Sequence, residues 1–474
     1  MISNRRNFLR MGASLPMAGA ASLPASLCHI GNAAAQSASS DDYKALVCIY
    51  MAGGADYANT LVPFDDTSYA AYQSYRTDIA IKKQELIDKG LVLNPTVPLN
   101  QRAFALAPTL APLLPKFQQQ RMAVLLNIGT LIKPLTKSEF NQKKSNRLEV
   151  PFSLFAHDDQ RRFFLSTGQD GLVNGWGGRI SDHFLDQNTE PALSCVSMGG
   201  ISNFLNGQRA FQFIVPPAGP TVIRPAINGN FNMIDGMGDF LLGTSGHMFE
   251  QEYVQILARS MATKDVLVNG VTEAIPNATT YSALRPASND NSSKAQLGKQ
   301  LAYVARMIKG RQNMGLKRQV FFCEIGGWDL HSSLSTNHPT LLDAVGSCMA
   351  AFDDLAQEWG FADQVTQFTS SEFGRTLSGN GDGSDHGWGS MHFVLGGAVN
   401  GGRYYGKPPV IGVNTVDDVG AGILLPTTSV DQMAWTLARW MGVADADQAQ
   451  LLPHLSNFAP EVRDLGFMRS NVIA

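Results

Sequence analysis

Ala45-Leu46-Val47-Cys48-Ile49-Tyr50-Met51 is an unbroken apolar run that stops at a glycine pair, Gly53-Gly54. Such a run is typical of a strand that is buried on both faces of a parallel sheet. Similar runs lie at residues 122–128, 319–325 and 364–370, and helical patterns at residues 106–119, 297–308 and 341–359 separate them. Strands that alternate with helices predict an α/β fold with a mostly parallel sheet and helices on both faces.

The middle of the chain interrupts this alternation. Residues 200–246 are rich in Gly, Pro and Asn, which predicts an irregular insertion in the α/β fold. Residues 379–384 form a second glycine-rich segment, and we interpret it as a loop because no helix follows that would make it a phosphate-binding turn.

The first 35 residues have the features of an export signal. Arg5-Arg6 precede an apolar stretch rich in Ala, Gly and Ser at residues 11–27, and Ala33-Ala34-Ala35 offers a cleavage site before Gln36. We predict a twin-arginine signal peptide at residues 1–35 and one domain at residues 36–474. The protein is then expected to use the twin-arginine export machinery and to be periplasmic or secreted.

Charge and apolarity exclude some partners. Removal of the three signal-peptide arginines leaves 34 basic against 40 acidic residues, so the formal net charge changes from −3 to −6. An acidic protein is not expected to bind nucleic acid.

The sequence also predicts no stable membrane anchor, because no later apolar run has membrane-spanning length and Leu27 before Cys28 does not fit a lipoprotein signal. Cys48, Cys195, Cys323 and Cys348 show no paired spacing, so we expect no disulfide framework.

Carboxylates and imidazoles follow the predicted strands, at the edge where parallel sheets bind ligands. Asp56 comes just after Gly53-Gly54, and either a metal-ligand role or helix capping suits it. Asp329 and His331 lie two residues apart on an extended segment, so both can point to one side. Glu372 and Arg375 follow the strand at 364–370 and place a metal ligand and an anion binder at the same edge.

Three further candidate ligands are Asp385, His386 and His392. Histidines beside acids at strand ends favour metal binding over an ordinary structural role. We therefore predict one or two divalent metal ions. Mixed Asp, Glu and His ligation favours zinc or manganese and also allows magnesium or calcium.

These segments resemble those of the DUF1501 family. The resemblance rests on the twin-arginine start and on five ordered motifs: Met51-Ala-Gly-Gly-Ala-Asp56 with Asn59-Thr60-Leu-Val-Pro63, Gly326-Gly-Trp-Asp329-Leu-His331, Ser371-Glu-Phe-Gly-Arg-Thr376, Asp385-His-Gly-Trp388, and His392-Phe-Val-Leu-Gly-Gly397. It extends over essentially the whole predicted mature chain. The family is grouped with the alkaline phosphatase and sulfatase superfamily, so the resemblance implies that fold.

The resemblance also implies roles for individual residues. Asp56 matches the first-strand metal aspartate of the superfamily, and Asp329 with His331 matches a later ligand pair, although that pair is usually spaced more widely. The superfamily also has an Asp-His pair after the next strand, and this chain could match it in two ways. Either Glu372 replaces the aspartate and the histidine is lost, or Asp385-His386 supplies the pair from the loop.

The nucleophile is the point at which the chain departs from the pattern. Relatives carry Ser-His-x-Asp where this chain has Ala156-His157-Asp158-Asp159, so Ser153 or Thr60 would have to replace the serine. The reaction implied is hydrolysis of a phosphate or sulfate ester in a small or polymeric anionic substrate, with Arg375 neutralising charge and either water at the metal or Ser153 attacking. The alternative is a non-catalytic exported metal-binding protein that binds a polymer or protein partner through the same cleft.

Overall fold

The computed structural model describes residues 42–142, 149–168, 174–220, 248–272, 283–285 and 289–469. Contacts divide the chain into Met1–Asp42 and Tyr43–Ala474, and the elements described below belong to the second unit. The predicted signal peptide and residues 221–246 of the predicted insertion lie outside the described residues.

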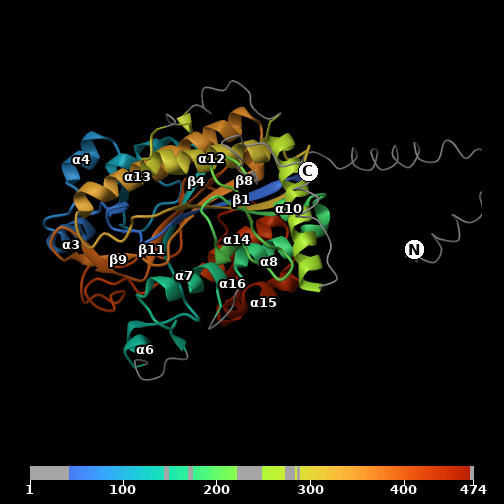
Figure 1. Ribbon diagram of the computed structural model, residues 1–474. Helices are drawn as coiled ribbons and strands as arrows, with labels where there is room; N and C mark the ends of the chain where they lie inside the picture. Colours follow the sequence, from blue (N-terminus) through green and yellow to red (C-terminus); the bar gives the residue numbers. More distant parts are fainter. Residues whose placement is uncertain are drawn as a thin grey trace, which may run out of the picture. The chain divides into compact units, whose positions relative to one another are not determined.

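A mixed, mostly parallel sheet forms the centre of the second unit (Figure 1). Its strands are β1 (Lys44–Met51), β4 (Met122–Gly129), β5 (Cys195–Ser197), β6 (Phe213–Ile214), β7 (Arg318–Ile325), β8 (Val365–Ser370), β11 (Ser390–Gly396), β12 (Arg403–Tyr405) and β13 (Thr428–Ser429). Their order is β12-β4-β11-β8-β1-β7-β5-β6, with β13 also paired to β4. β11 runs antiparallel to β4 and β8, and the other neighbours pair in parallel. The predicted α/β fold is confirmed.

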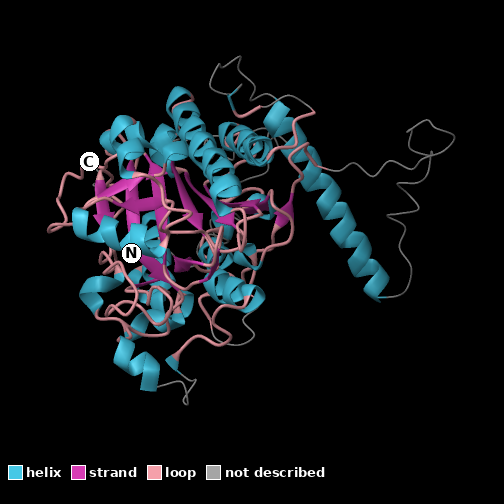
Figure 2. Cartoon of the chain, turned by 90° about the vertical axis from the view of Figure 1, so that its left-hand side faces the viewer, coloured by secondary structure: helices cyan, strands magenta, loops and turns pink. Residues whose placement is uncertain are grey.

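Helices cover both faces of the sheet (Figures 1 and 2). One face packs against α12 (Ser293–Lys309) and α13 (Leu334–Glu358), and the other against α7 (His157–Ser166), α8 (Trp176–Asp182) and α14 (Val430–Met441). Alternate residues of β1 supply the two cores: Val47 and Ile49 join the first, Cys48 and Tyr50 the second. This alternation explains why the strand is apolar throughout.

Shorter elements complete the unit. Two small sheets pair β2 (Leu61–Pro63) with β3 (Phe104–Leu106) and β9 (Arg375–Gly379) with β10 (Ser384–His386). The remaining α-helices are α3 (Asp66–Tyr75), α4 (Lys83–Asp88), α5 (Leu114–Gln118), α6 (Lys137–Gln142), α10 (Met248–Thr272), α15 (Gln448–Leu451) and α16 (Pro460–Arg463). The 3₁₀ turns are η2 (Pro108–Leu113), η5 (Leu185–Gln187), η6 (Pro191–Leu193), η7 (Asn203–Leu205), η8 (Ala362–Gln364), η9 (Asp445–Asp447) and η10 (Pro453–Asn457). None of the helices that the structure describes combines the length and apolarity needed to cross a bilayer.

One predicted helix differs from the structure. Residues 106–119 form the end of β3, the 3₁₀ turn η2 and the short helix α5 instead of one α-helix. Pro108, Pro112 and Pro115 explain the break, because proline has no N–H to donate within a helix and clashes with the preceding turn.

The register brings three chain segments to one edge of the sheet. Met51 of β1 pairs with Ile325 of β7, and Tyr50 pairs with Ser370 of β8. The segments that follow these three strands therefore begin side by side at their carboxyl ends, where the candidate ligands Asp329 and Glu372 were expected.

Candidate metal centre

The glycine pair after β1 allows the strand ends to meet. Gly53 has a φ of 126°, and a Cβ there would lie 2.3 Å from the backbone nitrogen of Asp329. A side chain at this position would therefore push the segment after β7 away. The Gly53 N–H also donates to Glu372 Oε1 over 2.8 Å, which ties the segment after β1 to the segment after β8.

Asp329, His157 and His386 form the candidate metal centre. Each supplies a ligand atom, and these atoms all lie within 4.8 Å of one another. Asp329 Oδ2 is 3.3 Å from His157 Nε2, and Asp329 Oδ1 is 3.1 Å from His386 Nε2. Donor atoms bound to one zinc ion at about 2.0–2.2 Å are roughly 3.4 Å apart in a tetrahedral site. The donor types and their spacing therefore fit a divalent metal.

His331 and Asp385 adjoin this centre. His331 Nε2 lies 3.0 Å from His386 Nε2 and 3.1 Å from Asp329 Oδ1, and His331 Nδ1 is 3.1 Å from Asp385 Oδ1. The imidazole of His331 is about half exposed, so it is open to a small molecule that reaches the centre.

The hydrogen bonds of the three imidazoles set their orientation. The Nδ1 atoms of His157, His331 and His386 face Glu372 Oε1 at 2.9 Å, Asp385 Oδ1 at 3.1 Å and the Phe155 carbonyl at 2.7 Å. A carbonyl or carboxylate oxygen accepts, so in the neutral rings the proton is on Nδ1 and the lone pair on Nε2. The Nε2 atoms of His331 and His386 lie 3.0 Å apart, so two neutral rings of this tautomer would direct their lone pairs toward each other, an arrangement that a cation beside them would stabilise.

Phe155 presents its carbonyl to His386 from an unusual turn. Phe155 has a φ of 76° and Ser153 a φ of 46°, so two non-glycine residues adopt the left-handed backbone region just before α7. Such conformations cost about 1 to 3 kcal/mol and persist only where the surrounding structure enforces them. The turn fixes both the carbonyl that orients His386 and the start of the helix that carries His157.

Arg375 holds Asp329 in place. Its guanidinium is fully buried and donates to Asp329 Oδ1 over 2.6 Å, to the Gly53 carbonyl over 3.2 Å and to the Ser384 carbonyl. Partial burial opposes ionisation of Asp329, but the hydrogen bond and charge of Arg375 outweigh it, so the pKa of Asp329 lies below its usual value. The carboxylate is therefore ionised at neutral pH, as a metal ligand must be.

Glu372 lies behind His157. Its side chain is 3% exposed, and besides His157 Nδ1 and the Gly53 N–H it accepts from the Tyr50 hydroxyl over 3.0 Å. The hydrogen bond to Glu372 outweighs the partial burial of His157 and raises the pKa of His157.

Three predicted site residues lie outside the cluster. Both carboxylate oxygens of Asp56 accept from the buried Arg76, over 2.5 and 2.6 Å. His392 is fully buried in β11, with Nδ1 3.4 Å from Thr369 Oγ1. The Ser153 side chain is exposed, and among the described residues its hydroxyl has no hydrogen-bond partner. The structure thus brings Asp329, His331, Glu372, Arg375, Asp385 and His386 together, without Asp56, His392 or Ser153.

His157 is the cluster member that the sequence analysis did not select. It is the first residue of α7, and its segment was considered only as the position of a missing serine. The sequence does contain a signal for His157, because two aspartates follow it in Ala156-His157-Asp158-Asp159. The other candidate histidines were selected because they also lie beside acidic residues.

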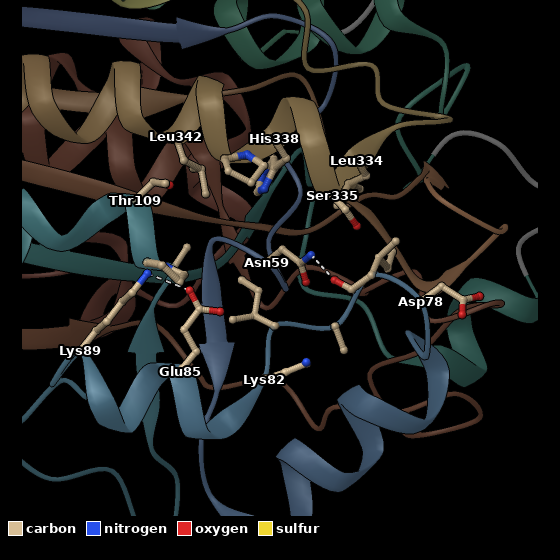
Figure 3. A pocket seen from close by; sticks show the side chains of 16 residues that line it. Asn59, Asp78, Lys82, Glu85, Lys89, Thr109, Leu334, Ser335, His338 and Leu342 are labelled. Atoms are coloured by element: carbon tan, nitrogen blue, oxygen red, sulfur yellow. Dashed lines mark hydrogen bonds and ion pairs between the residues drawn. The ribbon is translucent and has the colours of Figure 1, made fainter.

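A separate cavity of about 410 Å³ lies between α4 and α13 (Figure 3). Its lining includes Asn59, Glu85, Lys89 and His338, and none of the clustered residues. Lys89 is paired with Glu85 over 2.8 Å, and burial lowers the pKa of His338 to about 4, so this imidazole is neutral at neutral pH. The polar groups of this cavity do not converge on one point as those of the candidate centre do.

Comparison with known proteins supports the family resemblance over part of the chain. The family described as "Protein of unknown function (DUF1501)" matches residues 236–455. This range contains Asp329, His331, Glu372 and His386 and excludes Asp56 and His157. Among curated proteins, no relative is detected.

Solved structures with a similar arrangement are distant. Ps i-CgsB in complex with k-i-k-neocarrahexaose is 10% identical with a TM-score of 0.35, and the match covers 88% of this chain and 77% of that one. A structure concerned with the metabolism of multiple glycosaminoglycans by Bacteroides thetaiotaomicron is 11% identical with a TM-score of 0.34, covering 85% of this chain and 74% of that one. These values are too low to support any inference about activity or substrate.

Proposed function

We propose that His157, Asp329 and His386 bind a divalent metal ion and that the protein is an exported hydrolase of phosphate or sulfate esters. The observation that carries this proposal is the convergence of imidazole Nε2 atoms on the Asp329 carboxylate, with an oxygen beside every Nδ1. Histidines that ligate metals almost always donate their other ring N–H in this way. Two histidines and a carboxylate also form a common catalytic set for zinc, to which manganese is an alternative.

A divalent ion at such a site polarises the ester oxygens and lowers the pKa of water. The protein's own residues keep that site in shape. Arg375 and Gly53 fix Asp329 and the segment after β1, while Phe155 and Glu372 fix the two imidazoles. Because the Arg375 guanidinium is buried and donates to Asp329, we assign it the positioning of Asp329 in place of the charge-neutralising role expected from the sequence.

His331 and Asp385 are proposed to carry protons. Asp385 accepts the His331 Nδ1 proton, which places the His331 lone pair on Nε2, at the edge of the cluster, where it takes a proton from water as the water oxygen forms a bond to phosphorus or sulfur. The bond from phosphorus or sulfur to the ester oxygen breaks, and the proton on Nε2 passes to the leaving alkoxide. Water rather than Ser153 is assigned the attack, because Ser153 has no activating partner among the described residues.

A second proposal is a non-catalytic exported metal-binding protein. It is favoured by Ala156, which occupies the position just before His157 where the family resemblance places a serine. In that case His331 and Asp385 would support the metal site without a proton-transfer role, and a polymer or protein would bind the same cleft.

Metal analysis and an ester assay separate these proposals. Protein prepared without chelators is expected to contain stoichiometric metal and to hydrolyse p-nitrophenyl phosphate or p-nitrophenyl sulfate. Asp329→Asn should lower both metal content and hydrolysis. His331→Asn should keep the metal but lower kcat by about 10²- to 10⁴-fold, whereas Ser153→Ala should retain hydrolysis.

The control is His183→Asn, since His183 also lies near a carboxylate, Asp447 at 3.6 Å, but outside the cluster. It should change neither metal content nor rate. Metal-loaded wild type that hydrolyses no ester would reject the enzyme and leave the metal-binding protein. Wild type without stoichiometric metal would reject both.

A further inference from the structure

We propose that Glu372 is a positioning residue for His157 and not a metal ligand. This inference rests on the proposed metal centre and changes the role expected from the sequence, in which Glu372 itself binds the ion. The Glu372 carboxylate selects the tautomer of His157 that directs the Nε2 lone pair at Asp329.

Glu372 contacts His157 at Nδ1, the ring nitrogen that does not face Asp329. Oε1 accepts from the Gly53 N–H at 2.8 Å and from His157 Nδ1 at 2.9 Å. Oε2 accepts from the Tyr50 hydroxyl at 3.0 Å, while the Ser371 hydroxyl, 3.4 Å from Oε2, donates its one proton to the Met51 carbonyl at 2.8 Å. A carboxylate has about four acceptor positions. Three of them are in use, two of these on Oε1, and coordination by Oε1 would leave a buried donor without a partner.

The donors to Glu372 are themselves held rigidly. Tyr50 belongs to the central strand β1, and the guanidinium of Arg161 lies 4.7 Å from the centre of its ring. Arg161 in turn forms a two-point ion pair with Glu324 of β7, at 2.7 and 2.9 Å. The position of Glu372 is thus set by β1, β7 and α7 together, and this is the support that a precise metal site requires.

The environment of Glu372 differs from that of Asp329. Glu372 is 3% exposed, whereas the Asp329 side chain is 44% exposed and its Oδ2 contacts only His157 among the bonds described above. An exposed carboxylate with a remaining lone pair can bind an ion from solution. A buried carboxylate that accepts from the imidazole and from two further donors is placed to orient its neighbour.

Glu372→Ala and Glu372→Gln separate positioning from ligation. The alanine variant removes the acceptor, so His157 should shift from the Nδ1–H to the Nε2–H tautomer and zinc affinity should fall by about 100-fold. Glutamine keeps a carbonyl acceptor, so it should preserve the tautomer and lower zinc affinity by only about 10-fold. The tautomer is measured from the ¹⁵N shifts of histidine-labelled, metal-free protein at pH 9, with His157 assigned by comparison with His157→Gln.

Two further variants make the test independent of folding. Tyr50→Phe removes one donor to Glu372 without changing the shape of the core, and it should weaken zinc binding by a few-fold, in the same direction as Glu372→Gln. Asp182→Asn is the matched control, because Asp182 accepts from the backbone N–H groups of residues 208–210 and makes none of the contacts of the cluster. It should leave the His157 shifts and zinc affinity unchanged.

The outcomes distinguish this inference from the proposed function. An Nε2–H tautomer in metal-free wild type, or an unchanged tautomer in Glu372→Ala, would overturn the positioning role even if the protein binds zinc. Zinc binding by Glu372→Gln that is as weak as in Glu372→Ala would instead assign Glu372 as a ligand. If wild type binds no metal but its tautomer depends on Glu372, the orientation stands and the proposed function fails.

Discussion

Asp56 and Arg76 form a buried ion pair whose partners are both almost completely shielded from solvent. Burial alone would raise the pKa of Asp56, but the charge and hydrogen bonds of Arg76 outweigh it and lower that pKa. Removing one partner of such a pair leaves an uncompensated buried charge, which costs about 3 to 5 kcal/mol. Asp56→Asn should therefore reduce the free energy of unfolding by that amount, measured by urea denaturation. It should leave metal content unchanged, and loss of the metal from folded Asp56→Asn would restore Asp56 as a ligand.

The sequence predicted most of the cluster because strand ends meet at one sheet edge. Asp329, His331 and His386 were recognised from their residue types and their place after apolar runs. Asp56 has the same sequence context, but its partner Arg76 is twenty residues away, directly after α3. His157 was missed because it begins a helix and does not follow a strand. Burial and pairing, which decide between ligand and structural roles, depend on contacts that no local pattern contains.

At the scale of elements, the strand β11 is a second feature that local sequence patterns did not predict. The sequence analysis predicted a mostly parallel sheet and no strand at residues 390–396, so the antiparallel direction of β11 and its place between β4 and β8 were not predicted. Being inside the sheet, β11 buries His392 completely, so that the residue expected to bind metal is part of the core.

Burial of His392 in β11 makes the free energy of unfolding depend on pH. Desolvation lowers its pKa to about 3, compared with about 6.5 in the unfolded chain. Below pH 6.5 the unfolded state therefore binds more protons than the folded state. The contribution of neutral His392 to the free energy of unfolding is present above pH 6.5 and is lost as the pH falls. Between pH 7 and 5 the loss should be about 2 kcal/mol.

His392→Leu should abolish that part of the acid sensitivity. The measurement is the free energy of unfolding at pH 5, 6 and 7 in the presence of a chelator, so that metal release does not contribute. His338 is buried on α13 and also has a lowered pKa, so the free energy of unfolding of the variant should still decrease somewhat as the pH falls. Equal pH slopes for the variant and the wild type would contradict the assignment of His392 as a neutral core residue.

At the scale of the whole molecule, the candidate centre joins distant parts of the chain. His157 lies on α7, Asp329 follows β7 and His386 ends β10, so one ion would connect segments that are 57 to 229 residues apart along the sequence. A ligand that binds only the folded state stabilises it by about 2.7 kcal/mol at a free concentration of 100 times Kd. Zinc should therefore raise the Tm of chelator-treated wild type in a concentration-dependent way. His157→Gln should weaken this response, while the control His183→Asn should retain it.

The export prediction concerns residues outside the described part of the chain, and it follows from Arg5-Arg6 and the cleavage site Ala33-Ala34-Ala35. Twin-arginine machinery reads the arginine pair as an address, and lysine keeps the charge without the planar, five-donor guanidinium. Replacing both arginines by lysine should therefore leave uncleaved protein in the cytoplasm, detected by fractionation and by mass spectrometry of the N-terminus. Arg10→Lys, which conserves the same charge outside the pair, should be exported and cleaved before Gln36. Normal delivery of the double variant to the periplasm would show that the arginine pair is not the export signal, since charge alone would then be sufficient.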